Sequence, residues 1–560
     1  MTGTGHVPAI PIAPALAAAA LAATEALLPG AAAAETATGT VFEDRDGNGA
    51  RGPDEPGVAG VAVSNGREVV RTDAGGRYSL PVTGPTVLFV TKPSGYAVPL
   101  DLNNLPRFSY VHDPDGSPPG LRYRGVPPTG PLPDAIDFAL TPTPEPDRFT
   151  VIWLADPQPQ SAVELGHVRD DVLAELAGTD AAFGVTAGDI MFDDLSLWPR
   201  YNRLVGRLGI PWYNVPGNHD LNYLAEDDAR SLDTFKQTYG PTYYSFDYGR
   251  AHFVVLDNVA YEGRGADHPR GIGAYTGRID DDQLEWLKND LALVPDDRLV
   301  VLAMHIPLRT YLEPDGPGAG TANRQAVFDL LAGRPHLYAV AGHMHTTEHH
   351  YFGPGDGFAG PGELHQHVIA TVSGSWWSGP KDARGVPVAL QKDGTPNGYY
   401  LMDVDGASVT MRYRAAGHSA DHQLRITLDA SFHQSASEVL REFRAGELTG
   451  GGPIAVDQVP STEVLANLFD GGPRSRLTLE IGDGDPVEMA PAVRIDPYVL
   501  ELFRRHPEAI KPWVRPTPSF HLWAAPLPVD LGTGAHLLTV RATDEFGQSH
   551  VAHRLLEVTE

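Results

Sequence analysis

The sequence predicts an α/β (α+β) protein with a β-rich region on each side of its centre, and three observations lead to this prediction. Between Phe149 and Ala341, strand-like apolar runs alternate with runs of helical spacing, which is the pattern of an α/β fold. Before and after this stretch, short segments rich in β-branched and aromatic residues recur between turn residues. The length of 560 residues suits about three domains.

These shifts in pattern divide the chain into four parts. We expect a leader over residues 1–35, an N-terminal β-sandwich module with a Pro-rich arm over 36–146, a central domain over 147–379 and a C-terminal β-rich domain over 380–560.

The first 35 residues are rich in Ala and resemble an export signal. Ile10 to Leu28 is an apolar run interrupted by Glu25, and three alanines at 32–34 offer a cleavage site. No Lys or Arg precedes the run, so a disordered leader or a misplaced start codon is the alternative. We expect export, and no later stretch of the sequence reaches the ~18 apolar residues that span a bilayer.

The N-terminal module is predicted from five short β-rich segments separated by Gly and Asp, followed by a Pro-rich arm over 101–146 that ends as a stiff linker. The expected strands are Thr38–Phe42, Val61–Val63, Val69–Arg71, Tyr78–Pro81 and Val87–Thr91.

In the central region, most predicted strands end at a cluster of polar residues. Ligands of α/β sheets bind outside the carboxyl ends of the strands, so these clusters are expected to converge. The expected strands are Phe149–Ala155, Ala182–Ala187, Trp212–Val215, Leu299–Met304 and Leu337–Ala341, with a hairpin of Tyr243–Tyr248 and Ala251–Leu256. The expected helices are Val163–Leu176, Leu197–Leu208, Asp280–Leu293 and Ala322–Leu331.

After residue 380 the helical pattern fades and short strands return. We expect a hairpin of Tyr399–Val404 and Ser408–Ala415, strands at Leu477–Ile481, Phe520–Ala524, His536–Ala542 and His550–Val558, and one helix at Tyr498–Arg505.

The overall charge narrows the class of partner. The formal net charge is −29, and nucleic acids need Lys and Arg to displace their counterions. No nucleic-acid partner is therefore expected. A small phosphorylated substrate remains compatible, because a bound cation dominates the local charge of its site. The absence of cysteine excludes disulfides and thiolate metal sites, and the sequence leaves the oligomeric state open.

Five polar clusters carry residue types that bind divalent transition metals. In an extended segment, positions i and i+2 face the same way, so each such pair can serve one site. The clusters are Asp156-Pro157-Gln158, Gly188-Asp189, Gly217-Asn218-His219-Asp220, Ala303-Met304-His305 and Gly342-His343-Met344-His345.

In this order the clusters resemble the calcineurin-like metallophosphoesterase superfamily over roughly residues 149–379. The resemblance implies a two-sheet β-sandwich flanked by helices, and it implies two divalent transition metals such as Mn, Fe or Zn. One metal would take Asp156, Gln158, Asp189 and His345, and the other would take Asp189, Asn218, His305 and His343. With its two outer β regions, the chain is similar to a bacterial three-domain subgroup of this superfamily.

The resemblance also implies a reaction. A hydroxide bridging the metals would hydrolyse a phosphomonoester or phosphodiester, with His219 protonating the leaving oxygen. Asp193 and Asp220 are both candidates to orient His219. Gln158 stands where many members carry His, which puts the identity and occupancy of the first metal in question. The alternatives are a non-catalytic cell-surface or carbohydrate-binding protein on a decayed core, and a nuclease of the same superfamily.

Three other groups of residues invite a functional hypothesis. The spacing of Asp44, Asp46, Asn48 and Glu55 matches a Ca²⁺ loop, with an ion-free acidic turn as the alternative. Trp376, Trp377 and Asn397 are candidates to wall the cleft and contact a leaving group, or else to pack a domain junction. The histidines at 349, 350, 365 and 367 resemble a further metal cluster, but we expect them to be surface or strand residues.

Overall fold

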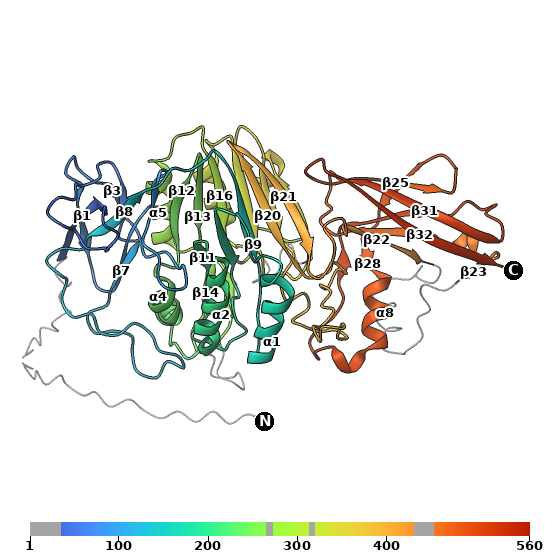
Figure 1. Cartoon of the computed structure of the whole chain (residues 1–560), viewed down its shortest axis with the longest axis horizontal. Coiled ribbons are helices and arrows are strands. Elements are labelled where there is room, and N and C mark those ends of the chain that lie inside the picture. Colours follow the sequence, from blue (N-terminus) through green and yellow to red (C-terminus); the bar gives the residue numbers. More distant parts are fainter. Residues whose placement is uncertain (1–34, 265–272, 313–319, 430–452) are drawn as a thin grey trace, which may run out of the picture.

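The computed structural model describes residues 35–264, 273–312, 320–429 and 453–560, and the predicted leader lies outside them but for its last residue. An N-terminal β region, a central α/β region and a C-terminal β region follow one another along the long axis of the molecule (Figure 1). The α/β fold with β-rich termini is therefore confirmed. Within these residues, no helix is both long and apolar enough to cross a bilayer.

The N-terminal region consists of two four-stranded sheets. One has the order β4 (Arg77–Val82), β1 (Glu35–Glu43), β8 (Phe138–Pro142) and β6 (Tyr96–Ala97); the other has the order β3 (Val69–Arg71), β2 (Ala62–Ser64), β5 (Thr86–Val90) and β7 (Ser109–His112). Alternate residues of β4 are buried, as expected for strands with one face on a core.

The central region contains two larger mixed sheets, in which three neighbouring strands of the first and four of the second pair in parallel. The five-stranded sheet has the order β11 (Trp212–Val215), β10 (Phe183–Ala187), β9 (Arg148–Leu154), β20 (Gly398–Asp405) and β21 (Ser408–Ala415). The six-stranded sheet has the order β12 (Tyr244–Tyr248), β13 (Ala251–Val255), β16 (Leu299–Ala303), β17 (Leu337–Ala341), β19 (Leu364–Val368) and β18 (Glu348–Phe352). A small ribbon pairs β14 (Val259–Tyr261) with β15 (Tyr275–Gly277).

The two large sheets pack on each other, and helices cover the outside. Val151 and Trp153 of β9 lie in the core shared by both sheets, whereas Ile152 and Leu154 lie in a second core under the helices. Burial on both faces explains why β9 is apolar at successive positions. The helices here are α1 (Ala162–His167), α2 (Trp198–Val205), α3 (Asp228–Ser231), α4 (Asp233–Tyr239), α5 (Asp281–Leu291) and α6 (Arg324–Leu331), with a π-helical segment η1 (Val168–Leu173) and 3₁₀ turns η2 (Leu195–Leu197), η3 (Gly206–Leu208) and η4 (Pro354–Asp356).

The hairpin β20–β21 was expected in the region after residue 379, but its strand pairing is with the central sheet. β20 runs antiparallel to β9, with Leu401 opposite Ile152. Strand pairing of this kind links segments about 250 residues apart, so local sequence pattern could not assign it. The predicted helix over Val163–Leu176 also differs, because α1 passes into the π-helical segment η1.

In its described residues, the C-terminal region is a β-sandwich with the α-helix α8 (Pro497–Arg505), close to the predicted one. One sheet has the order β22 (Leu424–Asp429), β24 (Glu463–Leu468), β30 (Leu522–Pro526) and β27 (Ala490–Pro491). The other has the order β23 (Ile454–Ala455), β32 (Ser549–Thr559), β31 (Gly534–Thr543), β25 (Arg476–Ile481) and β26 (Val487–Glu488). A ribbon of β28 (Arg494–Ile495) and β29 (Pro518–Ser519) and the turns η5 (Val459–Ser461) and η6 (Pro507–Ala509) complete it.

Candidate metal centre

Five loops at the carboxyl ends of central strands bring the predicted ligands together. Asp156 follows β9, Asp189 follows β10, Asn218 follows β11, His305 follows β16 and His343 follows β17. The first three strands belong to one sheet and the last two to the other. The predicted ligands therefore lie together at the carboxyl ends of strands from both sheets.

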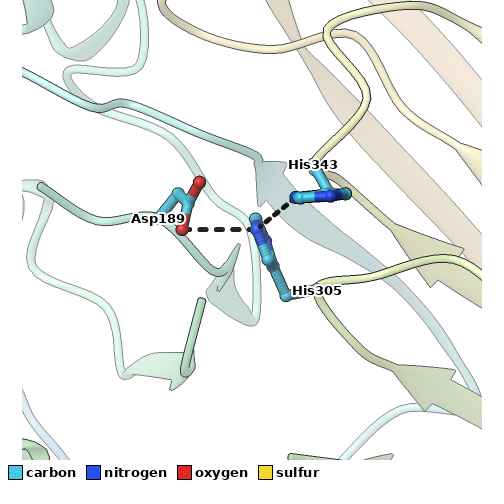
Figure 2. Close-up of side chains that lie close together, drawn as sticks. All are labelled: Asp189, His305 and His343. Carbon is cyan, nitrogen blue, oxygen red and sulfur yellow. Dashed lines mark hydrogen bonds and ion pairs between the residues drawn. The ribbon is translucent and has the colours of Figure 1, made fainter. Parts of the chain in front are cut away.

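His305 is at the centre of this cluster (Figure 2). Its Nδ1–H donates to the carbonyl oxygen of Ala187 at 3.0 Å, which directs Nε2 at the other side chains. That Nε2 lies 3.0 Å from Asn218 Oδ1, 3.2 Å from Asp189 Oδ1 and 3.2 Å from His343 Nδ1. Lone pairs gathered this closely repel one another unless a proton or a cation lies among them.

The other half of the cluster contains Asp156, Gln158 and His345. Gln158 Nε2 donates to Asp189 Oδ2 at 2.6 Å, while its Oε1 is buried and has no hydrogen-bond partner. His345 Nε2 lies 3.7 Å from Asp156 Oδ1, and its Nδ1 is held by the carbonyl oxygen of Gly374. A buried acceptor without a partner is costly, and coordination of a cation would satisfy it.

The backbone is strained at these loops. Nine non-glycine residues in the described ranges have positive φ, and only Asn104 lies away from the predicted motifs. Such conformations cost roughly 1–3 kcal/mol each and persist where the surroundings enforce them. The eight at the motifs are Asp156, Gln158, Asp189, Asp193, His343, His345, Trp376 and Trp377.

The glycine before each of three predicted ligands gives the space that the cluster needs. A Cβ on Gly188 would lie 2.4 Å from His305 Nδ1, and one on Gly217 would lie 2.3 Å from Asp189 Oδ1. A Cβ on Gly342 would lie 2.3 Å from Asp156 Oδ2. No side chain fits at these distances, so the glycines are part of the site's construction.

Burial shifts the protonation of the cluster strongly when no cation is present. Burial and the charge of Asp189 raise the pKa of Asp156 to about 7. Burial and the neighbouring charge of His305 lower the pKa of His343 to about 3. The pKa of His305 is raised to about 9, because Asp189 outweighs the opposing effect of burial. The protonation state of each acidic or basic group in the cluster thus depends on the charges of the others.

His219 stands beside the cluster and is oriented by Asp193. His219 Nδ1 and Asp193 Oδ1 are 2.7 Å apart, and the backbone N–H of His219 donates to Asp189 Oδ1. Burial lowers the pKa of His219, but the carboxylates of Asp189 and Asp193 outweigh it and raise this pKa above its usual value. The imidazole is 21% exposed, so a ligand can reach its other nitrogen.

Asp220 has a different task. Its carboxylate accepts backbone N–H groups of Gly217 at 2.9 Å, Ile190 at 3.1 Å and Met191 at 3.4 Å. It therefore ties the loop of Asn218 to the loop of Asp189 and makes no contact with the His219 ring. The choice that the sequence left open between Asp193 and Asp220 falls on Asp193 by geometry.

Two of the three residues predicted to contact a leaving group do not line a cleft. Trp377 is 4% exposed and its Nε1 donates to the carbonyl oxygen of Pro157. Asn397 is 5% exposed and its Nδ2 donates to Asp171 and to the carbonyl oxygen of Val372. That prediction is corrected for both, because their polar atoms are satisfied inside the protein. Trp376 instead stacks on His345, with ring centroids 3.9 Å apart.

The sequence did not point to two aromatic residues that form a stack with His219. The ring of Phe192 stacks on His219, with centroids 4.3 Å apart, and Trp513 stacks on Phe192 at 5.9 Å. Phe192 adjoins Asp193 in the chain, which was the available signal. Trp513 comes from the C-terminal region, so only the fold could bring it here.

The predicted calcium loop forms a compact turn. Asp44 accepts the N–H groups of Gly47 and Gly49, and ligating atoms of Asp44, Asp46 and Glu55 come within 4.8 Å of one another. The Asn48 side chain donates a hydrogen bond to Asp46 and accepts one from the backbone N–H of Ala50. The three carboxylates therefore lie where a hard cation could bridge them.

The histidines at 349, 350, 365 and 367 lie on strands β18 and β19, as expected, and all but His365 are buried. His349 and His367 are 1% and 0% exposed, and their rings are stacked at 4.1 Å. Both face Asp470 of the C-terminal region, with His367 Nε2 at 2.9 Å and His349 Nε2 at 3.5 Å from its Oδ1. The group joins the central and C-terminal regions.

The predicted metal ligands fit two divalent cations. Carboxylate, amide oxygen and imidazole are the donor types for Mn, Fe and Zn. The unpartnered Oε1 of Gln158 and the close approach of donor atoms around His305 are the features that a cation would satisfy.

Three family models match consecutive parts of this chain. They describe the N terminal of calcineurin-like phosphoesterase over residues 46–123, calcineurin-like phosphoesterase over 149–347 and the C terminal of calcineurin-like phosphoesterase over 366–550. The order of the three matches is that of the three regions in Figure 1. The chain belongs to the calcineurin-like phosphoesterases.

Individual relatives are distant. The "Probable glycerophosphodiester phosphodiesterase GpdQ" of Arcobacter nitrofigilis is 24% identical over 148 residues, which is 26% of this chain and 50% of that protein. The match thus spans about half the length of this curated relative. Among solved structures, purple acid phosphatase PPD1 from yellow lupin (Lupinus luteus) seeds is similar with a TM-score of 0.35 and 13% identity, over 64% of this chain and 69% of its own. PhoD has a TM-score of 0.33 and 13% identity, over 68% and 88%.

Proposed function

We propose that the protein is a metal-dependent hydrolase of phosphomonoesters or phosphodiesters. The observation that carries this proposal is the convergence of five strand-end loops on one cluster of oxygen and nitrogen donors, with the His219–Asp193 pair beside it. The curated relative's name includes a phosphodiesterase, which supports keeping diesters in the proposal.

Two divalent metals would be held by the residues on either side of Asp189. Asp156, Gln158 and His345 would share one ion with it, and the other would take Asn218, His305 and His343. When bound, such a pair polarises a phosphoryl group and lowers the pKa of water toward neutrality.

The chain's own residues would position the proton that the leaving alkoxide needs. Asp193 holds Nδ1 of His219, so the ring presents Nε2 to a bound ester. A proton at Nε2 would pass to the leaving oxygen, and the Asp193 carboxylate would stabilise the protonated ring before the transfer. Stacking against Phe192 restricts rotation of the ring.

The direct test is hydrolysis of p-nitrophenyl phosphate and bis-p-nitrophenyl phosphate by protein reconstituted with Mn²⁺, with and without a chelator. Turnover should need the metal and should fall to background in His305→Ala, which removes the central donor. A matched control is His336→Ala, because His336 lies outside the cluster. Metal-loaded protein that is inert on both esters would contradict the proposal and favour a decayed core.

Two further features belong to the same proposal: export of the protein from the cytoplasm, and a calcium ion bound by the loop of Asp44, Asp46 and Glu55. The leader-like composition of residues 1–35 supports export, and fractionation of cells producing the full chain tests it.

Addition of Ca²⁺ should raise the melting temperature, and Asp46→Ala should abolish this response. Asp73→Ala is the control, since Asp73 caps a similar turn through Gly75 and Arg77 but has no carboxylate partners for an ion. An equal response in both variants would exclude this loop as the calcium site.

A further inference from the structure

Three aromatic rings form a continuous stack that starts at His219 and ends in solvent. The ring planes of His219 and Phe192 are inclined by 22°, and those of Phe192 and Trp513 by 24°. Trp513 is 47% exposed. The exposed ring of Trp513 is thus connected to the proton donor of the proposed reaction through one intervening ring, Phe192.

The segment that carries Trp513 is held on both sides of that residue, by the central region through Lys511 and by a small core through Val514. Lys511 Nζ pairs with Glu164 Oε1 at 2.7 Å, and the N–H of Lys511 donates to Ser378 Oγ at 3.2 Å. Next to Trp513, Val514 is 1% exposed in a small core with Leu390. The ring is therefore held in place before any ligand arrives, which reduces the entropy lost on binding.

The position of the stack determines which part of a substrate would meet it. A general acid must lie within hydrogen-bond reach of the leaving oxygen, so the leaving alcohol begins next to His219. The carbon skeleton of that alcohol extends from this oxygen. The ring of Phe192 stacks on His219, and Trp513 continues the stack beyond Phe192.

The chemistry of this surface favours a flat, unsaturated group. Phe192 has no polar side-chain atom, and the indole of Trp513 offers one donor only. Such a surface gains little from the hydroxyl groups of glycerol or a sugar. Aromatic rings, in contrast, stack on aromatic side chains whatever their substituents, because each has a π-face.

We infer that Phe192 and Trp513 form the leaving-group subsite of this enzyme, and that the subsite takes phosphoesters whose leaving alcohol carries a planar aromatic group, such as an aryl ring or a nucleobase. The inference rests on the proposed function, since it takes His219 as the proton donor. It gives the C-terminal region a part in substrate choice, through a single loop between α8 and β29.

The test compares Trp513→Ala with the wild type on two esters, phenyl phosphate and glycerol phosphate. For each ester, the kcat/KM of the variant is divided by the kcat/KM of the wild type. The different intrinsic reactivities of the two esters then cancel. Loss of one stacking partner should lower kcat/KM for the phenyl ester roughly tenfold, chiefly through KM, and leave the glycerol ester within about twofold. Trp513→Phe should restore most of the loss. Val529→Ala, a change at an exposed apolar residue of the same region, should change neither ratio.

A binding measurement separates this inference from the proposed function. Calorimetry with phenylphosphonate and methylphosphonate on the metal-loaded full chain should show a preference for phenylphosphonate that Trp513→Ala removes. If the wild type hydrolyses no ester but keeps this preference, the subsite stands and the hydrolase proposal fails. Equal losses on both esters, or no loss on either, would overturn the subsite even in an active enzyme.

Discussion

At the scale of single residues, two acidic side chains near the predicted ligands have different hydrogen-bond partners. His219 contacts Asp193 through Nδ1, whereas the carboxylate of Asp220 is used by backbone N–H groups. These two acidic residues were equivalent candidates in the sequence. Their different contacts give them different expected phenotypes.

Replacement of His219 by Ala should slow ester turnover by ~10²–10⁴-fold, because the leaving alkoxide loses its proton donor. Metal content should stay at the wild-type value. Asp193→Asn should reduce kcat less, since it only weakens the orientation and protonation of the ring. Measurement of kcat together with metal analysis checks both variants.

Asp220→Ala provides the contrast for this pair. Three N–H groups of two ligand loops would lose their acceptor, so metal content should fall along with activity. A variant of His219 that loses its metals, or a variant of Asp220 that keeps both metals and rate, would show that the roles are misassigned.

The glycines before the ligands permit a second test at this scale. In Gly217→Ala the new Cβ would lie 2.2 Å from the backbone nitrogen of Asp189, so one loop has to move. Metal affinity should weaken roughly 10-fold or more, as it does when supporting contacts of a metal site are disturbed. Titration with Mn²⁺ measures this effect.

The matched control is Gly333→Ala, where a Cβ would meet nothing within 4 Å. Circular dichroism of both variants distinguishes local displacement from unfolding. Unchanged metal affinity in a folded Gly217→Ala protein would mean that the loop yields more easily than its packing suggests.

At the scale of elements, strand β13 carries a buried charge that links stability to pH. His252 is 1% exposed and its two nitrogens lie 2.8 Å from Asp247 and 2.9 Å from Asp290. Burial lowers its pKa, but the two carboxylates outweigh this and raise it from 6.5 to about 9. The charged histidine therefore stabilises the folded protein most below pH 6.5.

This stabilisation, on the order of 3 kcal/mol, should be lost as the pH rises through 9. Urea unfolding of the wild type at pH 6 and pH 10 measures it. His252→Asn should be less stable at pH 6 and should lack this part of the pH dependence. His336→Asn should keep the wild-type profile, and the same flattening in both variants would refute the assignment.

Several elements could be read from local pattern alone. Strand β11 begins and ends as expected, and β17 does as well, because each is a short apolar run bounded by turn residues. The pattern failed at β20 and β21, whose partner β9 lies far away in the chain. It also failed to separate α1 from η1, since both fit helical spacing.

At the scale of the whole molecule, the C-terminal region is joined to the centre by a buried polar group. Asp470 Oδ1 receives His367 Nε2 at 2.9 Å and the hydroxyl of Tyr400 at 2.8 Å. The charge of Asp470 is stabilised by these donors, and its pKa lies well below the usual value although burial acts in the opposite direction.

Asp470→Asn should loosen this junction by about 3 kcal/mol, because the buried ring of His349, whose pKa Asp470 raises against the effect of burial, loses its counter-charge. Hydrogen exchange should then rise in β18, β19 and β24 while the N-terminal region stays protected. Asp485→Asn, an exposed change in the same region, is the control. Unchanged exchange in β18 and β19 would remove Asp470 as a determinant of the junction.

This junction also explains why Trp513 reaches the metal centre. The loop that carries it is held by Glu164 and Ser378 of the central region, so its position depends on how the two regions dock. A loosened junction in Asp470→Asn should therefore weaken phenylphosphonate binding without removing the metals.

The alternation of strands and helices, and the position of the five polar clusters at strand ends, could be predicted before any contact was known. These follow from local rules: side-chain periodicity within an element, and glycine or polar residues where a strand ends. They were sufficient to predict that the polar clusters would converge, whereas the assignment of donors to two metals came from the resemblance to the calcineurin-like metallophosphoesterases.

Only the tertiary structure decided which groups meet across long distances. It paired His219 with Asp193 instead of Asp220, buried Trp377 and Asn397, and placed Trp513 in a stack with Phe192. The physical reason is that each choice depends on the packing of separate elements, where a hydrogen bond or ring contact needs ångström precision. Neighbours in the sequence say little about contacts at that scale.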